Sequence, residues 1–209
     1  MKNQKIMLEL FSGSKTVSNF FESKCWQAIS VDNNARLCPS ICTDILQLNS
    51  VDLPSELGFT WASPDCSRLS RSAKQSHWKK VNIKKRVYQY TPATPEALIS
   101  LALVEKTVQI LQSFQGMPFV IENPIGRIQH LEPLKKLGHN RYYVNYADFG
   151  FEYSKETYLF TNLILPFSTK KITVRAPGLR TIRSKYQRSK VPEQLIAEIY
   201  KYIPGNVLE

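Results

Sequence analysis

The sequence predicts an α/β protein with a mostly parallel β-sheet and helices on both faces. Short apolar segments typical of buried strands alternate with segments typical of helices along most of the chain. The chain has 209 residues, enough for one domain with its own core. Its apolar fraction of 43% and charged fraction of 22% are typical of globular rather than disordered chains.

The first part of the chain predicts short strands around one helix. Val17, Phe20 and Phe21 fall on one side of a helical turn, which indicates an amphipathic helix. The segment KIMLEL before it is apolar enough for a buried strand. The expected elements are a strand at Lys5–Leu10, a turn at 12–14, a helix at Thr16–Ser23, a strand at Gln27–Val31, a short third element at Ile41–Leu46 and a strand at Phe59–Ala62.

The rest of the chain predicts one long helix, further strands and two shorter helices. Pro95 is typical of a helix start and Gly116 of a helix end, with a regular apolar pattern between them. Residues Ser67–Thr94 show no clear period and are expected to form a long polar, basic stretch. The expected elements are a helix at Pro95–Gln115, a strand at Pro118–Ile121, a helix at Leu131–Leu137, strands at Arg141–Tyr146 and Thr157–Asn162 paired through Asp148–Lys155, and a helix at Pro192–Ile203.

Positive charge is confined to two segments of the chain. The net charge is +11, yet residues Ser67–Pro95 hold eight Lys and Arg residues and no acid, and residues Thr157–Pro192 hold eight more and no acid. All 17 acidic residues therefore lie elsewhere. A single basic run is usually a solvated surface, but two acid-free runs in an otherwise acidic chain favour a polyanion, and nucleic acid in particular.

Cysteine and hydropathy patterns indicate a cytoplasmic protein. Four cysteines in a chain of this length are expected to be reduced thiols. Cys38 and Cys42 have no CxxC or nearby histidine to complete a zinc set, so no metal site is expected. No apolar run reaches the roughly 18 residues that span a membrane. Residues Met1–Lys5 lead into an apolar run broken by Glu9, so no signal peptide is expected.

Polar residues that carry chemistry follow several of the predicted strands. In a parallel sheet the carboxyl ends of the strands meet at one edge, where ligands bind. The residues expected there are Phe11-Ser12-Gly13, Asp32, Asp44, Ser63-Pro64-Asp65-Cys66 and Glu122-Asn123-Pro124. A lone cysteine usually only fills space, but this placement favours a functional thiol at Cys66.

Three of these residues together suggest a nucleoside cofactor. Gly13 allows a tight turn after the first strand, although FSGS lacks the full glycine spacing of a dinucleotide fingerprint. Asp32 lies about 20 residues further on, where an acid can bind ribose hydroxyls. Asp44 follows the third element and could accept a hydrogen bond from an adenine amino group. Helix capping and turn formation are the alternative roles for both acids.

Seven segments carry a resemblance to a known family. They are LELFSGSKTVSNFF, SVDNN, CTDIL, WASPDCSRLS, FVIENP, YADFGFEYSKETYLFTN and RSKVPEQLIAEI. Their order and spacing resemble the DNA (cytosine-5) methyltransferases, and the chain looks most like the small phage-type members. The resemblance covers nearly the whole chain. It implies a Rossmann-like fold that depends on S-adenosylmethionine, in a single domain over residues 1–209.

The resemblance also implies a cofactor site. Phe11, Ser12 and Gly13 would line the S-adenosylmethionine pocket, and Asp32 would hold the ribose. Asn33 would sit beside the adenine, Asp44 would take its amino group and Ile45 would pack near the ring. Ser63 and Pro64 are placed in the same site.

By the same resemblance, Cys66, Glu122 and Lys155 are the catalytic residues. The Cys66 thiolate would attack C6 of a cytosine, which makes C5 nucleophilic enough to take the methyl group. Glu122 would hold N3 and the amino group of the base. Because a thiolate is required, a lowered thiol pKa is expected, with help from the basic residues that follow. The base would have to flip out of the helix.

The chain departs from the family pattern at several positions. Asp65 stands where the family usually has proline, and a negative charge there would raise the thiol pKa unless it turns away or pairs with Arg68. Lys155 and Thr157 replace two arginines, and a lysine does not copy an arginine fork. Lys15 replaces a glycine of the first motif, and Ser189 stands where asparagine is common.

Nucleic acid contacts are expected from the basic segments. The family reads sequence with a separate domain, but here about 25 residues, 163–187, occupy its place, fewer than the roughly 40 that fold alone. We expect a recognition site of about two to four base pairs and strong salt dependence. The resemblance implies double-stranded DNA as the partner. The residues predicted to bind it are Arg68, Arg71, Lys79, Lys80, Lys84, Lys85, Arg175, Arg180 and Arg183.

Three alternatives to a DNA cytosine-5 methyltransferase stay open. The same chemistry on RNA is poorly separated by sequence. A catalytically weak or inactive DNA-binding protein on the same fold is suggested by Asp65, Lys15 and Thr157. An amino methyltransferase would want an Asn/Asp-Pro-Pro-aromatic motif, which SPDC does not supply. No membrane partner is expected, and a monomer is the expected state.

Overall fold

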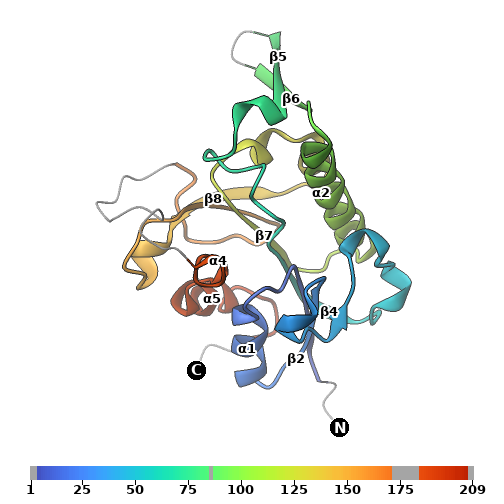
Figure 1. Cartoon of the computed structure of the whole chain (residues 1–209). Coiled ribbons are helices and arrows are strands. Elements are labelled where there is room, and N and C mark those ends of the chain that lie inside the picture. Colours follow the sequence, from blue (N-terminus) through green and yellow to red (C-terminus); the bar gives the residue numbers. More distant parts are fainter. Residues whose placement is uncertain (1–3, 85–86, 171–183, 207–209) are drawn as a thin grey trace.

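The computed structural model describes residues 4–84, 87–170 and 184–206. A seven-stranded sheet has the order β3-β2-β1-β4-β7-β9-β8, and β9 alone runs against the other strands (Figure 1). The predicted mostly parallel sheet is therefore confirmed. Its strands are β1 (Ile6–Leu10), β2 (Gln27–Asp32), β3 (Ile41–Cys42), β4 (Leu57–Ala62), β7 (Phe119–Pro124), β8 (Asn140–Asn145) and β9 (Glu156–Thr161).

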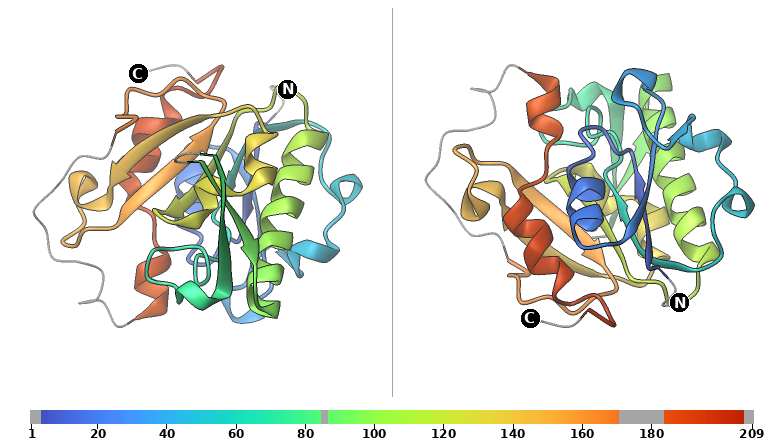
Figure 2. Two further views of the ribbon diagram at one scale, coloured as in Figure 1. Left: turned by 90° about the horizontal axis from the view of Figure 1, so that it is seen from above. Right: turned by 90° about the horizontal axis from the view of Figure 1, so that it is seen from below.

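Helices cover both faces of this sheet, also as predicted (Figures 1 and 2). On one face lie α1 (Thr16–Ser23) and α5 (Glu193–Tyr200), and on the other lie α2 (Pro95–Ser113) and the short α3 (Glu132–Lys135). The remaining turns are short 3-10 or α segments. They are η1 (Ala35–Leu37), η2 (Ile45–Gln47), η3 (Ser50–Asp52), η4 (Gln75–His77), η5 (Arg127–His130), η6 (Tyr146–Phe149) and α4 (Lys185–Ser189).

Two apolar cores form because successive strand residues point to opposite faces of the sheet. On β1, Met7 packs toward α1 and α5, whereas Leu8 packs toward α2. The central strands β1, β4 and β7 are buried along most of their length, as expected for strands covered on both sides. The helix α2 starts where the sequence predicts, because Pro95 occupies its first turn and the Thr94 hydroxyl accepts a hydrogen bond from the Ala97 amide.

The helices α1 and α5 are joined by aromatic contacts although they lie at opposite ends of the chain. The Tyr200 ring meets the Phe20 and Phe21 rings edge-on at centroid distances of 5.7 and 5.5 Å. The Trp26 Nε1 donates to the Tyr200 hydroxyl at 3.3 Å. These contacts hold α1 and α5 together on one face of the sheet.

Two segments have a local structure that the sequence pattern did not specify. The polar, basic stretch at 67–94 has no clear period, yet in the structure η4 is followed there by a second, two-stranded sheet of β5 (Trp78–Lys84) and β6 (Val87–Pro92). The expected element at Ile41–Leu46 is only the two-residue β3 followed by η2, since Asp44 caps η2 and ends the extended backbone. The strand pair at 141–162 is confirmed, with β8 antiparallel to β9.

Two other expectations concern membrane-spanning helices and the short basic segment. No helix among the described residues is long and apolar enough to cross a membrane. Most of the short basic segment at 163–187 lies outside the described residues, so its role is not tested by the fold.

Candidate active site

The carboxyl ends of β1, β2, β4 and β7 lie at one edge of the sheet, as their parallel registers require. The strand order reverses between β1 and β4, because β2 and β3 extend to one side of β1 and β4 and β7 to the other. In open α/β sheets, the crevice at such a reversal is where ligands bind. The loops after β1 and β4 flank this point.

The turn after β1 is held in an unusual backbone conformation. Phe11, Gly13 and Lys15 all have positive φ, at 59°, 46° and 53°. A left-handed backbone costs least at glycine, which explains Gly13 in the middle of the turn. The Ser12 amide donates to the Val31 carbonyl at 3.0 Å, but the buried Ser12 hydroxyl has no hydrogen-bond partner. A buried polar atom of this kind is suited to a ligand.

Asp32 ties this turn to the end of β2. Its Oδ2 accepts the Gly13 amide and its Oδ1 accepts the Asn34 amide, both at 2.9 Å. Each carboxylate oxygen keeps a second acceptor position that a ribose hydroxyl could use. The Lys15 ammonium reaches across to the Cys38 carbonyl at 2.9 Å, so the lysine that replaces a family glycine links the same two segments.

The other predicted cofactor residues, Asn33, Asp44 and Ile45, differ from one another in burial and in contacts. Asp44 is exposed and its carboxylate accepts the Leu46 amide at 2.9 Å, which is the helix-capping role left open above. Ile45 is buried in the apolar core beside α2, and Asn33 is exposed. Of these three residues, none contributes an unpartnered buried group to the crevice.

The glycine turn and Asp32 nonetheless fit a nucleoside cofactor. They combine an unpartnered buried hydroxyl with a carboxylate that has acceptor capacity left. A Cβ at Gly13 would lie 3.6 Å from the Ser189 Oγ, so the end of α4 closes one side of this turn. Ser189 comes from the last of the family-like segments, and the fold brings it to the first.

Hydrogen bonds hold the Ser63–Pro64 corner that precedes Cys66. The Ser63 amide donates to the Leu10 carbonyl at 3.2 Å, and the Trp61 indole donates to the Ser63 hydroxyl at 2.9 Å. The buried Asn123 amide group donates to the Pro64 carbonyl at 2.7 Å. The Ser63–Pro64 corner is therefore held by both β1 and β7.

Beyond Cys66 the chain turns and lies against the segment after β7. The Cys66 carbonyl accepts the Leu69 and Ser70 amides at 3.1 and 2.9 Å. Ser70 forms an isolated bridge with Gly126, and the Arg127 amide donates to the Leu69 carbonyl at 2.6 Å. A Cβ at Gly126 would lie 2.0 Å from the Leu69 carbonyl oxygen. Only glycine permits this approach.

Glu122 is the centre of a buried polar cluster. Its Oε1 accepts the Tyr146 hydroxyl at 2.8 Å and lies 3.3 Å from the Lys155 ammonium. Both charged side chains are almost fully buried, at 5% and 7% exposure. The Lys155 ammonium also lies 4.4 Å from the centre of the Tyr146 ring. These donors orient the carboxylate.

The expectation of a lowered thiol pKa at Cys66 is wrong. Burial raises the pKa of Cys66, and the negative charges of Glu122 and Asp65 raise it further, whereas the Lys155 ammonium lowers it. The basic residues after Cys66 do not reverse this, because the thiol is desolvated in the loop. The charges of Glu122 and Lys155 therefore act on the thiol in opposite directions.

Asp65 does not pair with Arg68. The exposed Asp65 carboxylate instead accepts hydrogen bonds from the Ser67 hydroxyl and amide. Its charge therefore turns to solvent but still contributes to the raised pKa of the thiol.

The predicted nucleic-acid contacts fall into three groups. Arg68 is half-buried and its Nε has no partner, and the Arg71 guanidinium lies 3.6 Å from the Glu156 carboxylate. Lys79 and Lys80 are exposed on β5, and the backbone of Lys84 ends that strand. The remaining four, Lys85, Arg175, Arg180 and Arg183, lie outside the described residues.

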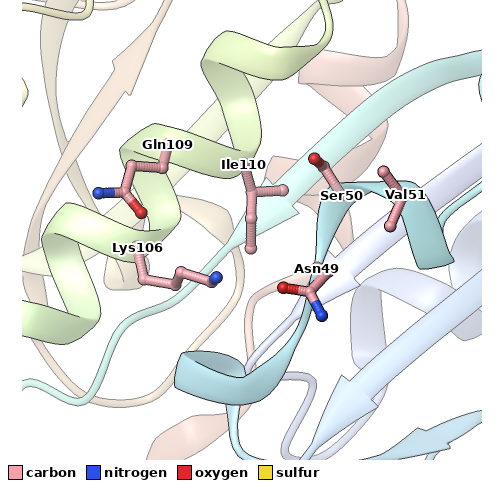
Figure 3. Close-up of a pocket in the computed structure, with 6 residues that line it drawn as sticks. All are labelled: Asn49, Ser50, Val51, Lys106, Gln109 and Ile110. Atoms are coloured by element: carbon pink, nitrogen blue, oxygen red, sulfur yellow. The ribbon is translucent and has the colours of Figure 1, made fainter.

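A surface hollow between η3 and α2 lies away from these residues (Figure 3). It is lined by Asn49, Ser50, Val51, Lys106, Gln109 and Ile110. None of them is a predicted site residue.

Sequence reasoning assigned no role to three residues that shape this site, although it placed Asn123 at this edge of the sheet. Tyr146 binds Glu122, Asn123 holds the Pro64 carbonyl, and Gly126 admits the Cys66 turn. A signal for Tyr146 was present, because the predicted pairing of the two strands around residues 148–155 brings residue 146 opposite Lys155. The other two depend on contacts across the sheet edge that spacing does not reveal.

No family model and no curated protein sequence matches the chain, but solved structures do. A protein from an E. coli prophage, assigned as a DNA modification methyltransferase, matches with a TM-score of 0.52 at 14% identity, over 76% of this chain and 46% of that one. The Entamoeba histolytica methyltransferase EhMeth matches with a TM-score of 0.53 at 14% identity, over 82% of this chain and 58% of that one.

The chain thus spans about half the length of these two structures. At such identity the likeness shows the fold alone, which is the Rossmann-like fold that these two methyltransferases share with the chain. The activity has to be argued from the site itself.

Proposed function

We propose that the chain transfers a methyl group from S-adenosylmethionine to C5 of cytosine in DNA, through a covalent bond between Cys66 and C6. The observation that carries this proposal is the cluster of Cys66, Glu122 and Lys155, in which a thiol, a carboxylate and an ammonium act on one another at the carboxyl edge of the sheet. A metabolite-binding domain without group transfer would have no use for a thiol beside an oriented carboxylate.

The first step is addition of the Cys66 thiolate to C6 of the base. Sulfur forms the new bond, and the electron pair of the C5–C6 double bond shifts through the ring toward N3. Glu122 supplies the proton that N3 then takes. The Tyr146 and Lys155 donors on Oε1 stabilise the carboxylate that remains, because charge-assisted hydrogen bonds are strong in a buried setting.

The second half of the reaction restores the aromatic base. When bound, S-adenosylmethionine supplies an electrophilic methyl group to which C5 can bond. As C5 takes the methyl group, N3 gives its proton back to Glu122. The proton on C5 then passes to solvent, and the electron pair that it leaves re-forms the C5–C6 double bond while the C6–sulfur bond breaks and Cys66 leaves as thiolate. Covalent catalysis of this kind divides one difficult step into easier ones.

The residues that would hold the cofactor are those of the glycine turn. Asp32 would accept from ribose hydroxyls with its free acceptor positions, and the Ser12 hydroxyl would find its missing partner there. DNA is the proposed substrate because the exposed lysines of β5 lie on the chain that continues from Cys66, where they can contact phosphates.

The test is a covalent trap with DNA that contains 5-fluorocytosine. Fluorine at C5 cannot leave as a cation, so the final elimination fails and the protein stays bound to DNA on a denaturing gel. Wild-type protein with S-adenosylmethionine should give a shifted band, and Cys66→Ser should give none. Cys42→Ser is the matched control, since Cys42 is an exposed free thiol away from Glu122.

Three outcomes have distinct meanings. A band in wild type and Cys42→Ser alone supports the proposal. No band in any variant, with unmodified DNA also left unmethylated, contradicts it and favours a binding protein on this fold. A band with RNA carrying the same base, and none with DNA, would replace the substrate.

A further inference from the structure

The β5–β6 hairpin, residues Trp78–Pro92, stands away from the main sheet at the top of the molecule in Figure 1. It forms a sheet of its own and does not extend the central one. The sequence gives it no acidic residue and five basic ones, at 79, 80, 84, 85 and 86. Neither the catalytic cluster nor the glycine turn uses it.

The base of the hairpin is anchored to the turn that carries Cys66. The buried Trp78 indole donates to the Arg68 carbonyl at 2.8 Å, and Arg68 lies within the turn closed by the Cys66 carbonyl. The Ala93 amide donates to the His77 carbonyl at 2.8 Å and closes the other strand. The orientation of the hairpin is therefore linked to the position of the thiol.

One face of the hairpin packs on the body of the protein. Trp78 and Tyr90 belong to this inner face, since Lys80 pairs with Tyr90 and alternate residues share a face. The Tyr90 ring lies 5.3 Å from the His130 ring of η5. Burial, and then the cations Arg141, Lys135 and Lys80, lower the pKa of His130, so the surface beside the hairpin is positive.

The outer face of the hairpin combines a lysine with exposed apolar side chains. Lys79 pairs with Thr91 and Val81 with Gln89, so these four side chains share that face. Val81 is 47% exposed, and Ile83, two residues further along β5, is 50% exposed. Branched apolar side chains this exposed next to lysines are not part of a core. They form a surface that combines positive charge, methyl groups and an amide.

We propose that the outer face of the β5–β6 hairpin enters the major groove of double-stranded DNA and reads base edges beside the target cytosine. A two-stranded ribbon fits a groove about 12 Å wide. Apolar side chains contact the thymine methyl group, a glutamine can pair with adenine, and lysines hold phosphates or guanine. The proposal rests on the proposed function only for the identity of the polymer as DNA.

The positive charge favours DNA over other partners of a protruding apolar ribbon. The hairpin sequence has basic residues and no acidic ones, so its charge complements a polyanion such as DNA. No comparable feature of the outer face favours a protein partner. The anchoring through Trp78 gives the contact a purpose, because groove binding would fix the distance between the recognised bases and Cys66. This would supply sequence readout in a chain with a short recognition segment.

The test selects bound sequences from a random library of DNA duplexes, a readout that needs no methyl transfer. The full chain is compared with Val81→Ala/Gln89→Ala and with a matched control, Val51→Ala/Gln109→Ala, which alters the same residue types at the hollow in Figure 3. We expect wild type and control to enrich one short motif. The outer-face variant should lose about tenfold discrimination at one or more positions, with its affinity for random DNA within about twofold of wild type.

A second pair of variants separates phosphate contacts from base reading. Lys79→Gln/Lys80→Gln should weaken binding to all sequences about equally and reduce the slope of log K against log salt by about 2. Lys24→Gln/Lys201→Gln, exposed lysines near α1 and α5, should leave both unchanged. Thermal melting confirms that each variant is folded.

Three results would overturn the proposal. One is enrichment of an unchanged motif by the outer-face variant. Another is wild-type binding without any sequence preference. The third is binding of vesicles of anionic phospholipid that depends on Val81 while duplex binding does not. A motif that depends on the hairpin, found together with a negative fluorocytosine trap, would support the hairpin and contradict the proposed methyl transfer.

Discussion

Asp65 is the residue whose charge acts on the thiol from the adjacent position in the chain. Burial, Glu122 and Asp65 all raise the pKa of Cys66, so a smaller fraction of the thiol is ionised near pH 7 than in an ordinary cysteine. Asp65→Asn removes one of these charges and should shift the pH profile of kcat/KM toward lower pH. The variant should be about threefold faster than wild type near pH 7, with equal rates at high pH.

This profile is measured from pH 6 to 10 with Asp52→Asn as control, because Asp52 is an exposed acid on η3. Coincident profiles for wild type and Asp65→Asn would show that the carboxylate is screened by solvent.

Tyr146 is a positioning residue for Glu122. Loss of a hydrogen bond to a charged group costs about 1.5–3 kcal/mol, so Tyr146→Phe should lower kcat about 10- to 100-fold. The KM for S-adenosylmethionine should stay unchanged, since Tyr146 does not contact the glycine turn. Single-turnover methylation measures the first quantity and a cofactor titration the second.

Tyr158→Phe is the matched control on β9, where the ring stacks with Arg141 rather than binding Glu122. If Tyr146→Phe leaves kcat unchanged, or if it changes only the KM for S-adenosylmethionine, Tyr146 has no role in orienting the Glu122 carboxylate.

Single residues of the site were predictable to different degrees. Cys66, Glu122 and Lys155 follow from motifs, and the structure pairs Glu122 with Lys155, whose charges act on the pKa of the Cys66 thiol. The direction of the thiol pKa was not predictable, because burial decides it and the sequence shows only the flanking charges. Asp44 could not be resolved between capping and ligand binding, since both use the same carboxylate.

At the scale of elements, the Cys66 turn depends on its contact with the segment after β7. Gly126→Ala places a Cβ 2.0 Å from the Leu69 carbonyl oxygen, so the turn must move. We expect methyl transfer to fall at least about 100-fold, as a misplacement of about 1 Å can do. Binding of S-adenosylmethionine should persist, because the glycine turn lies on other strands. Isothermal titration and a methylation assay separate the two.

Gly116→Ala is the control for backbone strain. It lies in open space with φ at 73°, so it costs about 1 kcal/mol without moving a neighbour. Equal activity losses in both variants would point to general destabilisation instead of a displaced turn.

Glu9 makes the contact between β1 and α1 sensitive to pH. Burial raises the pKa of Glu9 from 4.5 to about 7, although Ser18 donates hydrogen bonds to it. Between these values the native state keeps a proton that the unfolded chain has released, so the free energy of unfolding falls as the pH rises. Relative to wild type, Glu9→Gln should become more stable by about 3 kcal/mol from pH 4.5 to 7.

Urea unfolding at pH 5, 6, 7 and 8 measures this difference, with Glu22→Gln, an exposed acid on α1, as control. A constant difference between Glu9→Gln and wild type over this range would mean that Glu9 is ionised throughout.

The elements themselves were largely predictable where packing follows a regular pattern. The helix at Thr16–Ser23 has the predicted bounds because its apolar side faces a sheet. The β5–β6 hairpin was missed because its strands are exposed on one face and carry lysines, so no apolar alternation marks them. Its stability comes from Trp78 and Tyr90, whose partners are distant in sequence.

At the scale of the whole molecule, the candidate cofactor site joins the first and last family-like segments. A ligand that binds only the folded chain stabilises it by about 2.7 kcal/mol at 100 times its Kd. S-adenosylmethionine should therefore raise the melting temperature of wild type. Asp32→Ala should remove the increase, since Asp32 holds the glycine turn and would hold the ribose.

Asp148→Ala, an exposed acid on η6, serves as the control for this melting series. An unshifted wild-type melting temperature at saturating cofactor would favour the non-catalytic binding protein among the alternatives.

The aromatic contacts between α1 and α5 have a consequence for the order in which the protein can fold during synthesis. Phe20 and Phe21 leave the ribosome early, whereas Tyr200 emerges about 180 residues later. A nascent chain must keep this apolar patch uncovered until α5 appears, at a synthesis rate of about 5–20 residues per second. The contact between α1 and α5 is thus among the last to form. Until then, a partly synthesised chain exposes the apolar side of α1, where chaperones can bind it.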